Sequence, residues 1–530
     1  MKKRLINIIL IMTLLFSCVP AKTVQAAPAL EIRVGLTSCY YGKNQININN
    51  TKITMGYVKD RTFTAEATFT SDNGFTFKPA SEYYISLNEP CATYAETLTK
   101  KKVYFQSHGK ISGAVTGKGE WQVYCGPFES YMDAEEAVKK LQNSGAKKAY
   151  ILGGSNYRLK LIWGTSEIII DLDEDMEYPQ FEAASKYENM GYFVDLGERV
   201  YRGRIEIGRY GKAGLTAVNI VPLEEYVYGV VASEMPEDWP EEALKAQAVC
   251  SRSYAVVKAG ISSQSDGKAG YKISDSTDSQ VYRGVMFEKE ACTKAVDSTR
   301  GEMVYFNNKA VAAYYFSSGG GSTESSDAVW GVDLPYLMAK ADAMEGSFAI
   351  KPWKLALTLT ELTNRIASYS KTVGPVKDIN TVRVSESGRV SLLRIMGENG
   401  SLAMQTTSIR NVLGVKGTKM TLVKYGDKPD VVSAKNSEDE KEISLKDSYV
   451  KTTAGVREIS GSNGQVIVKS ASNLKGYGLT APDTPDEIWI YGIGSGHGVG
   501  MSQTGAAGMA EKGYDYKDII EYYFTGCHVS

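Results

Sequence analysis

Apolar and polar residues alternate along much of the first part of the chain. Between Leu30 and Tyr84 the segments IRVGL, QINI, TFTAEATFT and FTFKP place apolar side chains at nearly every second position. This spacing is typical of β-strands, whose side chains point to opposite faces in turn. We therefore predict a β-rich region at residues 30–115.

The pattern changes in residues 118–175. Trp121 to Tyr124 predicts a strand, Gly126-Pro127 a turn, and Ser130 can cap a helix that has Asp133 three residues on. Apolar residues then recur at helical spacing, and a strand follows, at Ala134, Ala137, Val138, Leu141 and Ala149–Leu152. This unit resembles the first half of a SPOR domain, a small module that binds peptidoglycan. Any α/β unit of this length would show the same pattern.

The second half of the chain mixes strands and helices. Residues 190–345 are strand-rich at first and then contain helices, and residues 352–425 alternate a helix with strands, as in an inserted subdomain. Residues 426–446 are charged and poor in aromatic side chains, which favours a linker. Residues 447–530 end in a glycine-rich and then helical stretch. The predicted class is α+β, a β-rich core with packed helices and two small α/β modules.

Length and charge narrow the possibilities. A chain of 530 residues is too long for one core and predicts two to four domains. Lys and Arg number 60 and Asp and Glu 61, so the basic excess of a nucleic-acid-binding protein is lacking. The 34 tyrosines suit strands and also suit stacking on sugar rings.

The N-terminus has the pattern of an export signal at residues 1–26. Three cations precede an apolar run from Leu5 to Phe16, which is short for a bilayer span. Small residues before Ala27 suit cleavage. The alternative is a lipoprotein site at Cys18, which Phe16 fits poorly. We expect an exported protein, in the cell wall, outside the cell or on the outer face of the membrane, with no transmembrane helix in the mature chain.

Cysteine and histidine usage argues against a metal centre. The mature chain has six cysteines with no C-x-x-C pair, and only three histidines, so we expect no metal and no cofactor. Export permits disulfides, and buried thiols are the alternative; the sequence does not choose between them. The cysteines are Cys39, Cys91, Cys125, Cys250, Cys292 and Cys527.

Five carboxylates gather in SEMPEDWPEE, and one of them stands apart. Met235 precedes Pro236 and is biased towards an extended conformation, so we expect Glu234 in a loop or at a strand end. Pro240 fits the first position of a helix, and Glu241 and Glu242 then fall in its first turn, where the helix dipole favours acids. Glu234 has no such explanation, and we predict a functional acid there.

The chemistry open to a single acid depends on the reaction. A general acid needs a pKa raised towards the working pH. Hydrolysis of a glycosidic bond usually takes two carboxylates. A lytic transglycosylase differs, since a hydroxyl of the sugar itself attacks and one acid/base can suffice. One protected glutamate is therefore chemically sufficient for glycan cleavage.

Several separated blocks resemble the SpoIID/LytB family of sporulation and cell-wall proteins. They are LTAVNIVPLEEYVYGVV, VVASEMPEDWPEEALKAQAVCSRSYAV, DSQVYRG, YYFSSGGGSTESSDAVWGVDLPYL and GSGHGVGMSQTGAAGMAEKGYDYKDIIEYYFTG. The resemblance implies a SpoIID-type core. It also implies one of two activities: SpoIID-type members are lytic transglycosylases whose acid falls on Glu234, and LytB-type members are amidase enhancers.

One departure from the family concerns a metal loop. Some members carry zinc on cysteine, histidine and cysteine around the DST that precedes QVY. We place Ile273, Asp278 and Ser279 at those positions, and such side chains do not make a structural zinc site. We therefore expect no metal at this loop.

Some further candidate substrate-binding residues follow the predicted acid closely in the chain. Others lie in the segments that resemble the family. Gln247 and Tyr254 lie two turns apart on one helix face, and Arg252 could bind the lactyl group of muramic acid or pair with the acids upstream. Tyr282 could stack on sugar or pack in the core. The remaining candidates lie in two glycine-rich segments and are Ser317, Ser318, His497 and Gln503; a Ser–His pair using Ser317 or Ser502 lacks an identifiable acid.

Two functions follow for these residues. The first is cleavage of the bond between MurNAc and GlcNAc in glycan strands that have lost their stem peptides. The second is a non-enzymatic activator that binds glycan and recruits an N-acetylmuramoyl-L-alanine amidase. A purely structural envelope protein would not need the SEMP and GHGVGMSQ segments.

Overall fold

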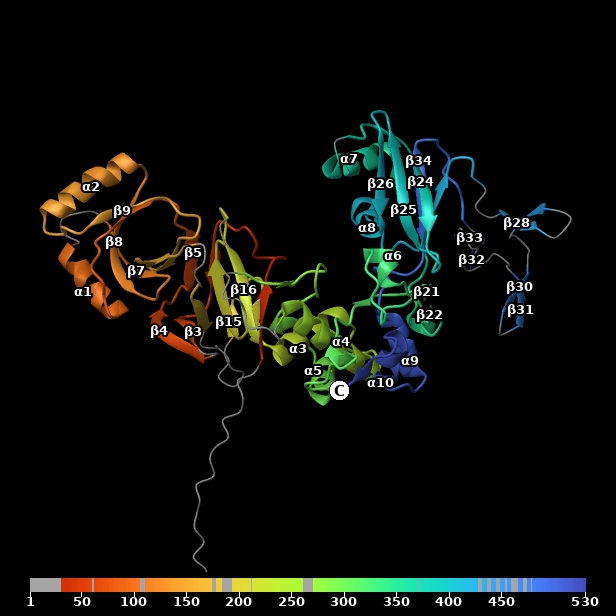
Figure 1. Ribbon diagram of the computed structural model, residues 1–530, viewed down its shortest axis with the longest axis horizontal. Helices are drawn as coiled ribbons and strands as arrows, with labels where there is room; N and C mark the ends of the chain where they lie inside the picture. The colour runs from red at the N-terminus through yellow and green to blue at the C-terminus, as the bar shows by residue number, and fades with distance from the viewer. Residues whose placement is uncertain are drawn as a thin grey trace, which may run out of the picture.

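The computed structural model describes residues 30–530 with internal gaps, and between residues 428 and 478 only the strands. The gaps are 60–61, 105–109, 174–177, 184–192, 211, 261–269, 371, 428–430, 436–439, 445–448, 453–454, 459–465, 470–473 and 478. The predicted signal segment and Cys18 therefore lie outside the described residues. The predicted α+β class is confirmed, with two large sheets, a central group of helices and a further α/β subdomain (Figure 1).

A seven-stranded sheet leads from the N-terminal region to the helices. Its edge strand β17 (Ile273–Ser274) pairs in parallel with β1 (Glu31–Gly35), which pairs antiparallel with β16 (Thr216–Pro222). Apolar side chains on these strands, such as Val34, are fully buried, as the alternating pattern predicts. The order continues through β15 (Arg204–Gly208), β12 (Gln180–Ala183), β3 (Lys52–Lys59) and β4 (Thr62–Thr70).

A complete βαββαβ unit forms half of the second sheet. Its elements are β6 (Tyr83–Ser86), α1 (Tyr94–Tyr104), β7 (Ile111–Thr116), β8 (Trp121–Phe128), α2 (Tyr131–Asn143) and β9 (Tyr150–Leu152). The strand order β7-β8-β6-β9 is antiparallel throughout, as in ferredoxin-like units. The segment that we assigned to a first half is thus the second half of this unit. Ser130 caps α2 as predicted, accepting the N–H of Asp133.

Four strands extend this second sheet beyond the βαββαβ unit. They are β2 (Ile46–Ile48), β5 (Phe75–Pro79), β10 (Leu159–Trp163) and β11 (Ser166–Asp171), in the order β2-β5-β10-β11 next to β7. Their apolar residues join the same continuous core as the first sheet and the central helices.

The central helices pack around α4. They are α3 (Leu223–Glu234), α4 (Glu241–Ala259), α5 (Glu290–Ser298), α9 (Gln503–Glu511) and α10 (Tyr516–Tyr523), and α4 contacts the other four. Helices α9 and α10 come from the end of the chain (Figure 1). The terminal strand β36 (His528–Val529) also returns to pair with β18 (Val304–Phe306). The predicted core thus unites residues that lie more than 250 positions apart.

The C-terminal subdomain has a hydrophobic core of its own. It contains β23 (Trp353–Thr358), α7 (Leu359–Tyr369), β24 (Val376–Val384), β25 (Val390–Gly397), β26 (Ser401–Gln405), α8 (Thr406–Leu413), β27 (Met420–Lys424) and β34 (Glu487–Gly492). Strand β34 lies between β23 and β27. The predicted insert at 352–425 therefore also needs residues 487–492, which contribute the buried Ile488 and Ile490.

Three hairpins precede β34 in the chain. They pair β28 (Val431–Lys435) with β29 (Glu440–Ser444), β30 (Tyr449–Thr452) with β31 (Gly455–Glu458), and β32 (Val466–Lys469) with β33 (Leu474–Tyr477). The first hairpin lies where the composition predicted a linker. The other two lie in a segment that we assigned to the C-terminal part of the core.

Short elements complete the description. They are β13 (Phe193–Asp195), β14 (Val200–Arg202), η1 (Val285–Phe287), β18 (Val304–Phe306), β19 (Lys309–Ala310), β20 (Tyr315–Phe316), β21 (Gly321–Ser322), α6 (Ser326–Trp330), β22 (Ala341–Asp342), η2 (Gly346–Phe348), β35 (Met501–Ser502) and β36 (His528–Val529). Among the described helices, none is long and apolar enough to span a membrane.

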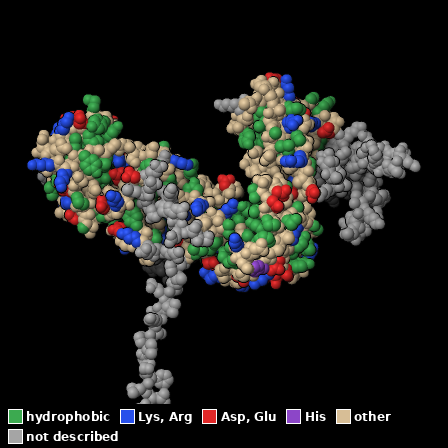
Figure 2. Space-filling view, in the orientation of Figure 1, with side chains coloured by type: hydrophobic (Ala, Val, Ile, Leu, Met, Phe, Trp, Pro, Cys, Tyr) green, Lys and Arg blue, Asp and Glu red, His purple; other side chains and the backbone are tan. Residues whose placement is uncertain are grey.

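Charged side chains of both signs are interspersed over the face seen in Figure 2. Five of the cysteines are free thiols in the described structure, namely Cys39, Cys91, Cys250, Cys292 and Cys527. All of them but Cys39 are buried, which fits the interpretation of small apolar core residues.

Candidate acid site at the end of helix α3

Glu234 is the last residue of helix α3, and the expectation of a loop or strand end was wrong. Met235 is extended, with φ −127° and ψ 142°, because Pro236 follows it. The proline thus ends the helix and fixes Glu234 in its last turn. The apolar segment that leads to Glu234 forms strand β16 only as far as Pro222. The apolar residues after Pro222 belong to the buried helix α3.

The carboxyl group of Glu234 accepts hydrogen bonds and is largely desolvated. Its Oε1 accepts the N–H of Val281 at 2.8 Å and the hydroxyl of Tyr315 at 3.4 Å. Burial raises the pKa of Glu234; the hydrogen bonds from Val281, Gln503 and Tyr315 and the charge of Arg283 oppose the rise. A position in the last turn, at the negative end of the helix dipole, also disfavours the charged form. The side chain keeps some exposure to solvent.

Glutamine and tyrosine side chains connect the acid to the helices behind it. The amide of Gln503 donates to Gln247 Oε1 at 3.3 Å and to the backbone oxygen of Glu234 at 3.4 Å. On the other side, Gln280 donates to the hydroxyl of Tyr315 at 2.9 Å. The structure therefore brings the predicted Gln247 and Gln503 to Glu234. We missed Tyr315 and Gln280, although both lie in the YYFSSGGG and DSQVYRG segments noted in the sequence.

Three other acids of the cluster lie beside lysines, and two of them hold the helix position predicted for them. Glu241 and Glu242 lie in the first turn of α4 and both pair with Lys245, at 3.0 and 2.7 Å. Glu237 is half-exposed and lies 3.6 Å from Lys289. Glu234 is thus the acid of this group whose pKa is raised by burial.

His497 lies on the opposite face of strand β20 from the acid. Successive side chains of a strand point to opposite faces, and Tyr315 faces Glu234 while Tyr314 and Phe316 contact His497. The ring of Trp330 also lies 5.5 Å from that of His497. The imidazole Nδ1 accepts the N–H of Val499 at 3.0 Å. His497 therefore packs beneath the site and does not touch the acid.

The imidazole of His497 should stay neutral far below the usual titration range. Burial, with the charges of Arg410 and Arg389, lowers its pKa to about 3. A depressed histidine pKa gives stability that is present above about pH 6.5 and is lost as the pH falls towards 3. We expect the His497 signal, assigned by comparison with His497→Gln, to be constant in an NMR titration from pH 8 to 5. A midpoint near pH 6.5 would contradict this placement.

Arg252 is committed to a buried ion pair and cannot bind substrate as proposed. Its side chain is 1% exposed, and Nε and Nη2 donate to the carboxylate of Glu224 at 2.9 and 2.7 Å. Nη1 and Nη2 also donate to the backbone oxygens of Glu302 and Val296. The alternative that Arg252 forms an ion pair is correct, but its partner is Glu224 and not one of the acids just upstream of the helix.

The two candidate tyrosines pack in the core. Tyr282 is 1% exposed, donates its hydroxyl to Asn219 at 3.0 Å and packs against Tyr226, so it offers no face to a sugar. Tyr254 is also buried, and its ring contacts Tyr314 edge-on. The sugar-stacking role is therefore wrong for Tyr282, and Tyr254 does not reach the acid through its described contacts.

The serines of the glycine-rich segments have structural partners. Ser318 is buried and donates to Glu345, and Ser502 caps helix α9 by accepting the N–H of Gly505. The backbone oxygen of Ser317 accepts the N–H of Thr504. No Ser–His pair forms among the described contacts, because Nδ1 of His497 already accepts from Val499.

Hydroxyl groups close the loop that was compared with the family's zinc loop in the sequence. Ile273 is fully buried in β17, while Ser279 Oγ accepts the N–H of Ser274 at 3.1 Å. Asp278 accepts from Ser276 at 3.3 Å. Within the described residues, no three His, Cys, Asp or Glu side chains lie close enough to hold a metal ion.

The candidate site is thus a largely desolvated carboxyl at the end of a helix, in a group of packed helices that is joined to β-rich modules. The SpoIID family model, described as stage II sporulation protein, matches residues 211–306, which include α3, α4 and Glu234. An uncharacterised protein of Brachyspira hyodysenteriae is 30% identical over 315 residues, 59% of this chain and 68% of that protein. The chain belongs to the SpoIID/LytB family.

Two Bacillus subtilis proteins are also similar. The amidase enhancer is 29% identical over 401 residues, which are 73% of this chain and 52% of the enhancer. Stage II sporulation protein D is 29% identical over 337 residues, 62% of this chain and 79% of that protein. The chain thus spans about half the length of the amidase enhancer.

Proposed function

We propose that the protein is an exported lytic transglycosylase that cleaves glycan strands of the cell wall, in sporulation or envelope remodelling. The observation that supports this most is the carboxyl of Glu234, which is desolvated enough to raise its pKa although the residue as a whole is partly exposed. A general acid at neutral pH needs this combination of a raised pKa and access to substrate. The family of the chain, with relatives named for sporulation and for amidase enhancement, supports a role at the wall.

The proposed reaction uses Glu234 twice. The protonated carboxyl gives its proton to the oxygen that links MurNAc to GlcNAc, and the bond from that oxygen to MurNAc C1 breaks. The carboxylate then takes the proton of the MurNAc 6-hydroxyl group. The oxygen of that hydroxyl group bonds to C1 and closes a 1,6-anhydro ring. The acid is restored and no water is consumed.

The groups around Glu234 suit both states of the carboxyl. The N–H of Val281 and the hydroxyl of Tyr315 stabilise the carboxylate after the first proton transfer. Burial favours the neutral, protonated form of Glu234 before that transfer. Burial and the hydrogen bonds thus act in opposite directions on the pKa of Glu234, and the net effect is a raised pKa, as a proton donor requires.

Removing the hydroxyl of Tyr315 should change the pH dependence of cleavage. This hydroxyl stabilises the charged form of Glu234, so Tyr315→Phe raises the pKa of the acid further. The alkaline limb of a kcat/KM profile, which reports loss of the proton from the free enzyme, should move to higher pH. An unchanged limb with a lower rate would mean that Tyr315 acts only through packing.

A second function, non-enzymatic activation of an amidase, has a specific observation in its favour. The similarity to the amidase enhancer covers a larger part of this chain than the similarity to stage II sporulation protein D. Such a protein would bind glycan and increase the turnover of an N-acetylmuramoyl-L-alanine amidase without cutting the strand. Assays of purified protein with intact sacculi and an amidase, in parallel with amidase-treated strands alone, separate the two functions.

We also propose that the βαββαβ unit at residues 83–152 binds glycan strands without stem peptides. Its complete ferredoxin-like topology and its resemblance to SPOR domains support this role. Such a module would keep the acid site close to glycan strands from which an amidase has already removed the stem peptides.

A further inference from the structure

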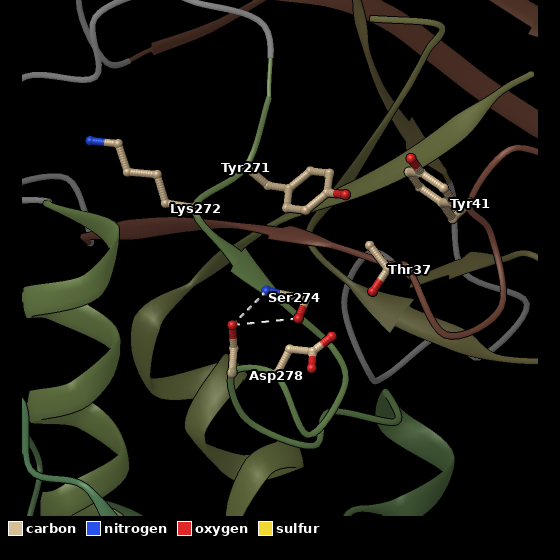
Figure 3. A pocket seen from close by; sticks show the side chains of 7 residues that line it. Thr37, Tyr41, Tyr271, Lys272, Ser274 and Asp278 are labelled. Atoms are coloured by element: carbon tan, nitrogen blue, oxygen red, sulfur yellow. Dashed lines mark hydrogen bonds between the residues drawn. The ribbon is translucent and has the colours of Figure 1, made fainter. Parts of the chain in front are cut away.

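A polar pocket with two tyrosines lies at the edge of the seven-stranded sheet (Figure 3). It has a volume of about 370 Å³ and is lined by Thr37, Tyr41, Tyr271, Ser274, Asp278 and Ser279, with Lys272 at its rim. In Figure 3 the hydroxyl groups of Tyr41 and Tyr271 point toward one another, and the amine of Lys272 extends away from them. No residue predicted to bind substrate lines this pocket.

Tyr271 is a fixed wall of the pocket. Its ring lies directly on Gly35, where an added Cβ would come within 2.4 Å of three ring atoms. The backbone beside it is held by the pairing of β17 with β1 and by Arg33, whose Nε donates to the oxygen of Gly270 at 3.0 Å. An aromatic side chain held in this way can contact a ligand with little loss of conformational entropy.

Tyr41, on the opposite wall of the pocket, holds the positively charged Lys212 beside it. Nζ of Lys212 donates to its hydroxyl at 2.6 Å and lies 4.8 Å from the centre of its ring. Lys212 is exposed, and the side chain of Tyr41 is 47% exposed. With Asp278 as the acid of the lining, the pocket combines aromatic surface, hydroxyl groups, one carboxylate and a nearby ammonium group.

The pocket and the acid site share one loop. Ser279 lines the pocket, and Val281, two residues further on, donates its N–H to Glu234 Oε1. Two residues span at most about 7 Å, so the pocket wall and the acid lie within the reach of neighbouring sugar rings. Ser274 and Ser279 hold this loop closed through hydrogen bonds, drawn as dashed lines in Figure 3.

We propose that this pocket is a glycan subsite for a sugar that carries a free carboxylate, next to the bond that Glu234 cleaves. The proposal rests on the proposed function and names its substrate class. The sugar ring packs on Tyr271, its hydroxyl and amide groups bond to Thr37 and Asp278, and its carboxylate pairs with Lys212. A MurNAc residue without a stem peptide has such a carboxylate on its lactyl group, whereas GlcNAc has none.

Binding to a catalytically silent protein tests the subsite. Glu234→Gln protein is titrated by calorimetry with an amidase-treated MurNAc–GlcNAc tetrasaccharide and with a neutral GlcNAc tetramer. Adding Tyr271→Ala should weaken binding of both about tenfold, through loss of the aromatic contact, while Tyr271→Phe should keep it. Adding Lys212→Ala should remove the preference for the charged ligand and leave the neutral one unaffected.

A second variant reaches the same wall without touching the ligand. Gly35→Ala must displace the Tyr271 ring and should also weaken binding. Unchanged affinities in the Tyr271→Ala and Lys212→Ala proteins would overturn the subsite proposal. Because Lys212 is exposed, its replacement should not disturb the fold and the result can be interpreted directly. If the wild-type protein binds through Tyr271 but does not cut glycan, the subsite stands and the transglycosylase proposal falls.

Discussion

Glycan cleavage should fall by about a thousandfold when Glu234 is replaced by glutamine. General acid–base catalysis by a positioned side chain contributes about 10²–10⁴-fold, and in the proposed reaction one carboxyl performs both proton transfers. Glutamine keeps the size of the side chain and can still accept the N–H of Val281, but it cannot give a proton to the leaving oxygen. The measurement is the initial rate of release of soluble fragments from amidase-treated strands.

Glu237→Gln is the matched control for this substitution. Glu237 lies three residues on, is 51% exposed and makes only a loose ion pair with Lys289, so its variant should cleave at the wild-type rate. Equal losses in both variants would point to a general effect of charge on glycan binding. A fully active Glu234→Gln protein would remove the acid from the mechanism.

The Glu234→Gln variant should also be at least as stable as the wild type at neutral pH. Burial raises the pKa of the carboxyl above its ordinary value of 4.5, so folding favours the protonated form. The corresponding stability is complete below pH 4.5 and is lost as the pH rises through the raised pKa. A thermal melt of both proteins at pH 4 and pH 7 tests the sign, since only the wild type carries this penalty at pH 7.

The second large effect is expected at Arg252, on stability and not on binding. Arg252→Met leaves the carboxylate of Glu224 without its guanidinium partner in a site where Glu224 is only 14% exposed. Breaking a buried pair by removing one partner costs about 3–5 kcal/mol. The free energy of unfolding, from denaturant titration followed by circular dichroism, should fall by that amount.

Arg300→Ala provides the comparison for an exposed pair. Arg300 is 56% exposed and pairs with Asp297 three residues before it, an arrangement worth about 0–1 kcal/mol. The double variant Arg252→Met with Glu224→Gln should recover part of the loss, because it removes the unpaired charge. A stable Arg252→Met protein with weakened glycan binding would instead restore the role in recognition that the sequence suggested.

The sequence was most informative where chemistry and local propensity act together. Pro236 and the acids after Pro240 predicted a break followed by a helix with acids in its first turn, and Glu234 stood apart because no local rule explained it. The helix before it was missed, because the apolar residues of α3 are buried on all sides and show no helical periodicity.

Long-range pairing was beyond the reach of the sequence. Tyr315 reaches Glu234 only because β20 pairs with β35, almost 190 residues further on. The same pairing turns the face that carries His497 away from the acid. Of His497 and Gln503, which the resemblance placed near the cleft, only Gln503 contacts Glu234. Likewise, β34 enters the C-terminal subdomain after three intervening hairpins, and no local pattern shows where such a strand will pair.

The most direct measurement is mass spectrometry of the glycan ends left on stripped strands by the purified protein. The predicted result is a series of fragments that end in 1,6-anhydro-MurNAc, one water lighter than reducing ends, which disappears with Glu234→Gln. Intact strands in both samples, together with faster turnover of an added amidase, would contradict the acid mechanism and leave the activator in its place.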